Sequence, residues 1–468
     1  MSTATRPLAV AAVLLHLSAG LLTAQSAAGL TVDQAVAMAL ANQPLIQQAQ
    51  AAVEAARARV GEAQSTYYPS VSGSASYNRI ADQSFSITSV LPPGVPLSAF
   101  GVSPGSPLDM LLSSPLSLAP DNNWDFNVGL NQVVYQFGKR EIQVKLAENG
   151  VSAAQVGVEQ IQLGLAFQTV QLFYSILFIK DQLAALDSQM QNLQEHLEGV
   201  QARMQTGSAT RYDELSTDSR ITVLQSQRID AQSVLEKQMI GLRQLLGMDS
   251  SAPLELSGDF TTSSAAPDEK ALLESGMANR PEVRQAAEAE SAAELNRRMA
   301  SAATYPTLSA HASIGYKTGI LPDINSLSLS WVAGLQLNVP VFQGFYEDRL
   351  ADEADQRLRA AREGTIAARR TVTTQVLQAV QDLKTAREQV DSARAELDQA
   401  QQVVDVVKVQ YDLGLLTNLE FLDAQAGLER AQLGSLQAQY REVLGEYALR
   451  QATGEKIWLS SANKLANQ

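Results

Sequence analysis

Apolar residues recur every seven positions along two long stretches of the chain. In residues 344–412 one such series is Leu383, Val390, Leu397, Val404 and Tyr411. Residues 138–205 contain an equivalent series, Ile176, Leu183, Met190, Leu197 and Met204. Heptad seams of this length predict α-helices that pack as coiled coils. At 1.5 Å per residue each helix would be on the order of 100 Å long, far beyond an ordinary globular helix.

Four shorter stretches alternate apolar and polar residues, which predicts β-strands. They lie at about residues 69–80, 123–136, 306–317 and 327–342. In the second stretch Trp124 and Phe126 alternate with Asp125 and Asn127. Two interpretations fit this alternation. One is a half-buried sheet, and the other is a membrane barrel with apolar groups toward lipid and polar groups toward a lumen.

The polar positions of these strands favour the membrane barrel. They carry mainly Ser, Asn, Gln and Gly, which suit a wet channel better than a solvated outer face rich in Lys and Glu. Four strands cannot close a barrel, and an open sheet edge is not tolerated in lipid. If the strands lie in a membrane, several chains must therefore contribute to one barrel.

The whole pattern occurs twice. Residues 124–247 match residues 331–454 at a constant offset of 207, and Ala41-Asn42-Gln43-Pro44 matches Ala278-Asn279-Arg280-Pro281 at an offset of 237. Each copy predicts a helix, two strands separated by a loop, a long helix, a short break and a further helix. The first copy carries about 30 extra residues, which fall in the Pro/Ser/Gly-rich loop 81–122. Long loops of a membrane barrel face outward.

These matches set the predicted domain boundaries. The first helix of each copy is expected from Thr31 to about Thr66 and from about Asp268 to Thr304, before Pro69 and Pro306. The predicted divisions are a signal peptide (1–24), a first repeat (25–250), a linker (251–267), a second repeat (268–456) and a C-terminal tail (457–468).

The N-terminus has the features of a secretory signal peptide. Arg6 precedes an apolar run, Pro7–Leu22, and small residues follow, which places cleavage between residues 24 and 28. The alternative, a membrane anchor, would need a longer apolar run. No later run approaches about 18 consecutive apolar residues, so we expect no membrane-spanning helix in the mature chain.

Composition and motifs exclude several kinds of site. The chain has no cysteine, hence no disulfide, thiolate metal site or lipid-attachment cysteine, and its formal net charge of −14 argues against nucleic-acid binding. Gly101-Val102-Ser103-Pro104-Gly105 fits the nucleophile-elbow pattern but lies in a Pro-rich loop without the required strand–turn–helix. Because a metal cluster and a Gly-rich phosphate loop are also missing, we expect neither enzymatic activity nor a cofactor nor a metal.

Two histidines remain after removal of the signal peptide. His196 is next to a seam position and is expected on a solvated flank of the coiled coil. His311 is expected toward the barrel lumen, or toward solvent if the sheet is an ordinary one.

Several segments resemble the TolC family of outer-membrane efflux proteins, and the resemblance covers essentially the whole mature sequence. The N-terminal helix Leu30–Ala35 and the strand endings Gln132–Tyr135 and Asn338–Phe342, followed by Gly138 and Gly344, resemble those of the family. Two helical-tip motifs are the most specific: Gly207-Ser208-Ala209-Thr210-Arg211-Tyr212-Asp213-Glu214-Leu215 and Tyr411-Asp412-Leu413-Gly414-Leu415-Leu416-Thr417-Asn418-Leu419-Glu420-Phe421-Leu422-Asp423-Ala424.

The resemblance implies a mainly α-helical fold with a membrane β-barrel portion, built from duplicated coiled-coil hairpins and four strands per chain. A homotrimer would form one 12-stranded barrel in the outer membrane of a Gram-negative-type bacterium and one α-helical tunnel in the periplasm. It also implies an equatorial collar, for which Asp249–Ala266 and Ile457–Gln468 are the candidates.

The implied function is a passive exit duct of a tripartite efflux or type I secretion system, with an iris-like gate at the periplasmic helical tips. Its partners would be a periplasmic adaptor protein, an inner-membrane pump of the RND, ABC or MFS type, and outer-membrane lipid, with no nucleic acid. The alternative is a soluble periplasmic coiled-coil scaffold without pore activity. The substrate is not legible, because a passive tunnel takes its specificity largely from its pump.

In the family, acidic residues after the second tip motif line the closed entrance, and the matching positions are Glu420 and Asp423. Because they are three apart they share one helix face, and a trimer would repeat them into a cation-selective ring of carboxylates. The alternative is a helix N-terminus whose acids complement the dipole. Leu416 stands where the family has an arginine, so Leu415 and Leu416 could hold the closed state by apolar contacts instead.

The resemblance further implies links between neighbouring helix pairs and docking of the adaptor at the tips. Asp213 and Tyr411 match one linked pair of the family. The other matching tip positions are Gly207, Thr210, Leu215, Gly414, Thr417 and Leu422.

Overall fold

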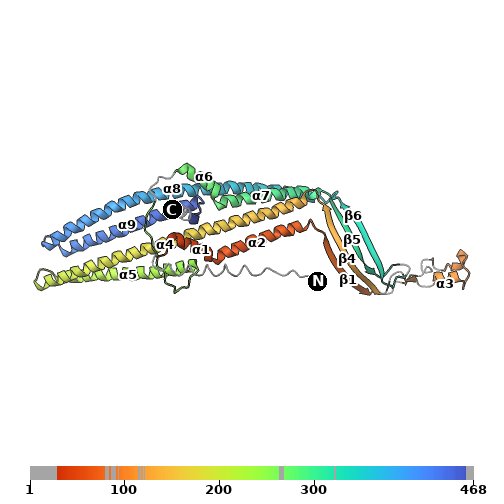
Figure 1. The fold of residues 1–468 in the computed structure, drawn as a ribbon, viewed down its shortest axis with the longest axis horizontal. Coiled ribbons are helices and arrows are strands. Elements are labelled where there is room, and N and C mark those ends of the chain that lie inside the picture. The colour runs from red at the N-terminus through yellow and green to blue at the C-terminus, as the bar shows by residue number, and fades with distance from the viewer. Residues whose placement is uncertain are drawn as a thin grey trace, which may run out of the picture. The chain divides into compact units, whose positions relative to one another are not determined.

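The computed structural model describes residues 29–79, 84–85, 91–92, 94–113, 116–117, 120, 122–262, 268–320 and 323–459 (Figure 1). The predicted signal peptide, residues 263–267 of the linker and residues 460–468 of the tail lie outside them. The chain forms two compact units. The first comprises the chain up to Val53, Ser152–Glu290 and the chain from Ala361 onward, and the second comprises Glu54–Val151 and Ser291–Ala360.

The helices reproduce the duplicated pattern, with two helices of 67 residues, α4 and α8, in corresponding places. The α-helices are α1 (Val32–Asn42), α2 (Pro44–Ser65), α3 (Pro107–Ser113), α4 (Lys139–Gln205), α5 (Arg211–Leu246), α6 (Glu269–Asn279), α7 (Pro281–Ser301), α8 (Tyr346–Asp412) and α9 (Asn418–Ala452). Short 3₁₀ turns are η2 (Leu97–Phe100), η3 (Ala302–Thr304) and η4 (Ile457–Leu459).

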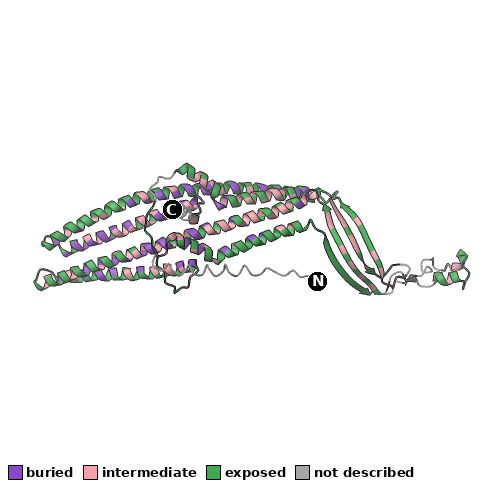
Figure 2. Cartoon of the chain, viewed as in Figure 1, coloured by how far each residue is buried: buried purple, intermediate pink, exposed green. Residues whose placement is uncertain are grey.

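The long helices pair as the heptads predict. In the first unit α4 runs beside α5 and α8 beside α9 (Figure 1), and buried positions recur along these helices (Figure 2). Buried seam residues include Ile176, Ile179, Leu183, Leu186, Leu193 and Val200 on α4 and Leu383, Val390, Val404 and Tyr411 on α8. The predicted fold class, mainly α with coiled-coil hairpins, is confirmed.

One predicted element is wrong in each copy. The first helix is broken after Gln43, so that α1 ends and α2 begins at Pro44, and the break recurs between α6 and α7 at Pro281. A proline has no backbone N–H and excludes the helical conformation from the residue before it. Gln43 and Arg280 are therefore extended, at ψ 123° and ψ 124°.

At both breaks a side chain is hydrogen-bonded to the C-terminus of a hairpin helix. Gln43 Nε2 donates to the carbonyls of Gln244 and Leu245 at the C-terminus of α5, at 3.1 and 2.8 Å. Arg280 Nη1 donates to the carbonyl of Gln451 at the C-terminus of α9, at 3.1 Å. These bonds satisfy carbonyls that a helix end leaves unpaired, so the proline breaks and hairpin ends stabilise each other.

The largest buried cluster of the first unit joins α1, α4, α5 and η4. Its core includes Val36, Phe173, Ile176, Leu246 and Ile457. The predicted capping box at Thr31 and Gln34 is present. Linker residues Leu254, Leu256 and Phe260 and tail residue Trp458 pack against the cluster, and Leu30 forms a parallel bridge with Leu256.

Among the described residues, α4 is a helix long and apolar enough to cross a membrane by length and composition alone. Half of its most apolar window is buried inside the protein, and Phe173 and Ile176 have no exposed surface. Packing inside the first unit accounts for this composition. From the sequence we expected no such helix because we considered uninterrupted apolar runs, whereas polar residues interrupt this stretch of α4.

The second unit contains an antiparallel sheet in the order β1-β4-β5-β6. Its strands are β1 (Ser70–Arg79), β4 (Asn122–Tyr135), β5 (Thr307–Lys317) and β6 (Ser328–Asn338). The last strand ends before the predicted limit of 342, because Pro340 cannot donate a ladder hydrogen bond. Within the long loop, β2 (Ser84–Phe85) pairs with β3 (Leu116–Ser117).

The register gives the sheet two chemically opposite faces. Asn131 pairs with His311 and His311 with Gly334, so polar and small residues lie in one row. In the next row Leu130 pairs with Ala312 and Ala312 with Ala333. Because side chains alternate between faces, the apolar face carries Val71, Tyr77, Trp124, Phe126, Val128, Leu130, Ile314, Tyr316, Leu329, Trp331, Leu335 and Leu337. These side chains are all exposed in the single chain.

Gly315 is the position in the sheet where a side chain is least tolerable. A Cβ there would lie 1.9 Å from the carbonyl oxygen of Phe126 on β4. We predict that Gly315→Ala costs about 3 kcal/mol of folding stability, seen as a lower thermal midpoint of the β signal in circular dichroism. Gly73→Ala is the matched control, since a Cβ there meets no atom within 4 Å. Equal midpoints for the two variants would contradict the prediction.

Candidate functional site

The two tips of the hairpins are built alike. Gly207 and Gly414 follow α4 and α8 with φ of 78° and 75°, a left-handed conformation that favours glycine at a helix end. Thr210 and Thr417 then cap α5 and α9, each in a full capping box with the residue three positions on. Four of the predicted tip residues are therefore explained by the turn that they build.

The capping boxes occupy two carboxylates that were predicted to act at the tips. The Asp213 carboxylate accepts from the backbone and the hydroxyl of Thr210 at 2.8 and 2.7 Å, rather than from Tyr411. The Glu420 carboxylate accepts from Thr417 in the same way, at 2.7 and 2.8 Å. Hydrogen bonds from Thr417 hold the pKa of Glu420 below its usual value, so this exposed group stays charged at neutral pH.

The structure separates the remaining predicted residues into two groups. Asp423 is exposed one turn after Glu420, and Leu415 and Leu215 are exposed on the tips. Leu416 is half-buried. Tyr411 and Leu422 are instead buried in the apolar cluster that joins the two hairpins. The exposed group is available to other molecules, whereas the buried group holds the chain's own hairpins together.

Asn418, the first residue of α9, connects the two hairpins through its side-chain amide. It is buried, with 4% of its surface exposed. Its Nδ2 donates to the Asp213 carbonyl and to the hydroxyls of Ser216 and Thr217 on α5, each at 3.2 Å. No pattern along the chain indicates this role, because a polar residue directly after a capping threonine is ordinary at a helix start.

His196 on α4 is the second connection, and its prediction as a solvated flank was wrong. Its Nε2 lies 2.7 Å from Asn418 Oδ1. The imidazole stacks on Phe421 at a centroid distance of 4.1 Å and lies 5.1 Å from the ring of Tyr411. A helical wheel for one coiled-coil pair places His196 outside the seam, but the second hairpin covers that flank.

Three further polar contacts join the hairpins. Arg203 of α4 donates to the Tyr411 carbonyl and to Asp412, at 3.2 and 2.9 Å, and its guanidinium lies 4.5 Å above the Tyr411 ring. Farther from the tip, Arg220 of α5 forms an ion pair at 2.9 Å with Glu429 of α9, which is largely buried. Gln189 also donates to Gln425, at 3.3 to 3.4 Å.

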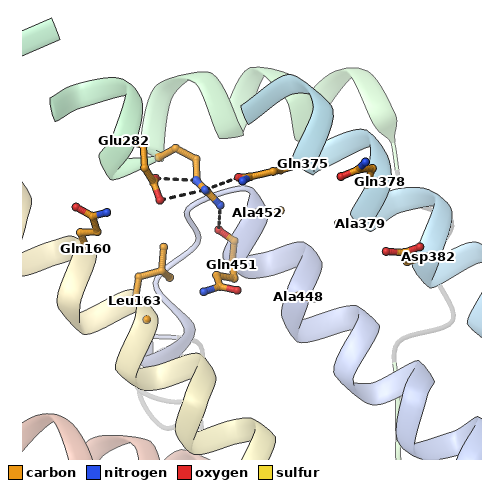
Figure 3. Close-up of a pocket in the computed structure, with 12 residues that line it drawn as sticks. Gln160, Leu163, Glu282, Gln375, Gln378, Ala379, Asp382, Ala448, Gln451 and Ala452 are labelled. Carbon is orange, nitrogen blue, oxygen red and sulfur yellow. Dashed lines mark hydrogen bonds and ion pairs between the residues drawn. The ribbon is translucent and has the colours of Figure 1, made fainter. Parts of the chain in front are cut away.

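A cavity of about 520 Å³ lies between α4, α7, α8 and α9 in the first unit (Figure 3). Arg280 is the buried charge in its wall. Its guanidinium donates to both oxygens of Glu282, to Gln375 and to the Gln451 carbonyl. Because these hydrogen bonds hold the ends of α7 and α9 together, we assign Arg280 a structural role. Across the described ranges, no group of three or more His, Cys, Asp and Glu side chains could hold a metal.

Comparison with known proteins gives one family. The family model described as outer membrane efflux protein matches residues 35–248 and 272–455. The chain is 24% identical over 461 residues to the outer membrane efflux protein BepC of Brucella suis biovar 1 (strain 1330), which covers 96% of this chain and 91% of BepC. It is 21% identical over 339 residues to TolC of Escherichia coli (strain K12), covering 69% and 68%.

Solved structures show the same fold. The outer membrane channel CmeC of Campylobacter jejuni superposes with a TM-score of 0.74 at 18% identity and covers 93% of this chain and 88% of that chain. The open-state channel MtrE of Neisseria gonorrhoeae gives 0.73 at 17% identity, covering 92% and 90%. The chain therefore belongs to the outer membrane efflux protein family, the TolC-like channels of the Gram-negative outer membrane.

Proposed function

We propose that three copies of this chain form one passive duct through the outer membrane, closed at its periplasmic end by the helical tips. An adaptor protein and an inner-membrane pump would open it. The observation that carries the proposal is the two-faced sheet with two unpaired edges, since it fits a shared membrane barrel and does not fit a soluble protein.

The two faces of the sheet match the two environments of a barrel wall, lipid and lumen. The apolar face exposes aromatic and aliphatic side chains, with Trp331 and Leu335 each 72% exposed. An exposed apolar surface of this extent is rare on soluble proteins and is normal on the lipid side of a barrel. The opposite face, with Asn127, His311 and Gln336, would line the lumen. A soluble periplasmic scaffold would leave the apolar face in water.

The long helices carry a second unpartnered surface. Outside the seams, apolar side chains remain exposed on α5 and α8: Val223, Ile229, Val234, Ile240, Val403, Val406 and Val409. Neighbouring copies of the chain would cover them and so complete a helical tunnel. The linker and tail residues that pack beside α1 would form its equatorial collar.

The entrance would be lined by Glu420 and Asp423. Both carboxylates are exposed, and both lie on the same face of α9. The capping role of Glu420 is compatible with this function, because the hydrogen bonds from Thr417 keep its charge in place. The exposed tip residues Leu215 and Leu415 would meet the adaptor.

The cargo depends on the pump. Relatives include the alkaline protease secretion protein AprF and the pyoverdine export protein OpmQ, both of Pseudomonas aeruginosa, and the toluene efflux pump component TtgC of Pseudomonas putida. The names of these relatives thus give cargoes as different as a protease, pyoverdine and toluene. We propose that the partner of this chain is an RND, ABC or MFS pump, and that this pump selects the cargo.

Neutralising the entrance carboxylates tests the duct and its constriction together. We predict that the purified protein conducts ions in planar bilayers, and that Glu420→Gln/Asp423→Asn lowers the cation-to-anion permeability ratio severalfold, since a carboxylate ring attracts cations. Asp391→Asn/Asp398→Asn is the control, with the same charge change at exposed positions of α8. Absence of conductance would contradict the duct, and equal ratios in the two double variants would contradict the constriction.

Removing the Asn418 amide tests whether the inter-hairpin contacts keep the tips closed. Asn418→Ala loses hydrogen bonds to His196, Asp213, Ser216 and Thr217. At a net value of about 1 kcal/mol each, with partial compensation by water, closure weakens by about 3 kcal/mol. Because each of the three chains loses these bonds, the open probability should rise at least about 100-fold.

Arg211→Ala is the control for this prediction. Arg211 holds the position in the first copy that matches Asn418. Its side chain is exposed, and its partner among the described residues is Glu214 on the same helix. It should leave the open probability unchanged. An Asn418→Ala channel as closed as the wild type would show that these contacts do not hold the tips together.

A further inference from the structure

His196 is placed where titration of one side chain would act on both hairpins. It extends from α4, lies against Tyr411 of α8 and Phe421 of α9, and is hydrogen-bonded to Asn418. The other described side chains of the apolar cluster that joins the two hairpins, here called the tip cluster, are aliphatic residues, Met, Phe and Tyr, none of which ionises near neutral pH. The surroundings of this imidazole therefore decide how the tip responds to protons.

The hydrogen bonds assign the neutral tautomer of the ring. The two N–H groups of Asn418 Nδ2 are shared among three acceptors on α5, so Oδ1 faces His196 and must accept. His196 Nε2 therefore carries the proton and donates at 2.7 Å. A second proton would go to Nδ1 and create an imidazolium between two aromatic rings.

The charged groups around the ring oppose that second proton on balance. On its own helix Arg203 lies above the Tyr411 ring and repels a positive charge. On α8, Asp412 attracts it but is exposed and already paired with Arg203. On the other two helices of the tips, the carboxylates of Asp213 (α5) and Glu420 (α9) are held in their capping boxes.

Burial affects the pKa of His196 more than the neighbouring charges do. Loss of solvent around the ring lowers the pKa of His196 below its ordinary value of 6.5, and the charge of Arg203 lowers it further, against the opposing effects of Asn418 and Asp412. A histidine with a lowered pKa in the packed state contributes stability at high pH. That stability is lost as the pH falls below about 6.5, the value for the solvated ring.

We propose that His196 is a proton-sensitive latch, and that its protonation separates the α8–α9 hairpin from the α4–α5 hairpin at the tip and opens the entrance. The latch rests on the proposed function, since it acts on the same closed tips. It makes acidity of the periplasm a signal that favours opening, alongside contact with a partner.

Proton linkage sets the size of the response. One site whose pKa differs between two states changes their equilibrium by at most about tenfold per pH unit. In a trimer that opens in concert, the three sites multiply this effect. We therefore predict that the open probability of the wild-type channel in planar bilayers rises at least about tenfold between pH 7.5 and pH 5.5.

Two variants remove the titration in different ways. His196→Gln keeps a donor toward Asn418 and loses the ring, whereas His196→Phe keeps the stacking on Phe421 and loses the donor. Neither should show the rise between pH 7.5 and pH 5.5. His311→Gln is the matched control and should retain it, because His311 belongs to β5 of the second unit, whereas the tip cluster belongs to the first.

The outcomes distinguish the latch from the gate on which it rests. An unchanged open probability in the wild type at pH 5.5, with Asn418→Ala still opening the channel, would overturn the latch and leave the gate. Persistence of the acid response in both His196 variants would also overturn the latch. Failure of both acid and Asn418→Ala to open the channel would contradict the gate itself.

Discussion

The unpaired edges of the four-stranded sheet are the constraint on which the rest of the structure depends. Among the described strands, β1 and β6 each have one side without a partner, and an unpaired backbone group costs several kcal/mol in lipid. The apolar face of the sheet nevertheless suits lipid. The proposed assembly meets both demands, because other copies would pair with these edges. Closing the barrel in this way would also repeat the side chains of the helices, including the carboxylates of α9, around one axis.

The two copies of the repeat share their framework and differ in their connections. Both use a left-handed glycine and a capping threonine at the tip. At the position after the threonine, however, one copy has exposed Arg211 and the other has buried Asn418. Duplication thus supplies two hairpins of equal length, and substitution at matching positions turns one of them into a binding surface for the other. The latch at His196 exists because of that divergence.

Periodic features could be predicted from the sequence, and contacts across the repeat could not. Heptads placed α4 and α8 to within two residues at each end, because a seam buries the same face at every turn. Alternation placed the strands and their two faces. The prolines at 44 and 281 are breaking signals, but the helical pattern continues on both sides of each and predicts one unbroken helix. His196 and Asn418 lie 222 residues apart in the sequence, and each gains its role from the other's hairpin. No local pattern reports such a contact.

Disulfide trapping between sheet edges tests the central claim most directly. The chain has no native cysteine, so one can be placed at Ser72 or Ser74 on β1 and one at Ser328, Ser330 or Val332 on β6, all on the polar face. If β1 of one copy pairs with β6 of the next, oxidation of at least one combination in membranes yields covalent dimers and trimers and no larger species. Monomers in every combination, or a ladder that continues beyond three chains, would contradict the account.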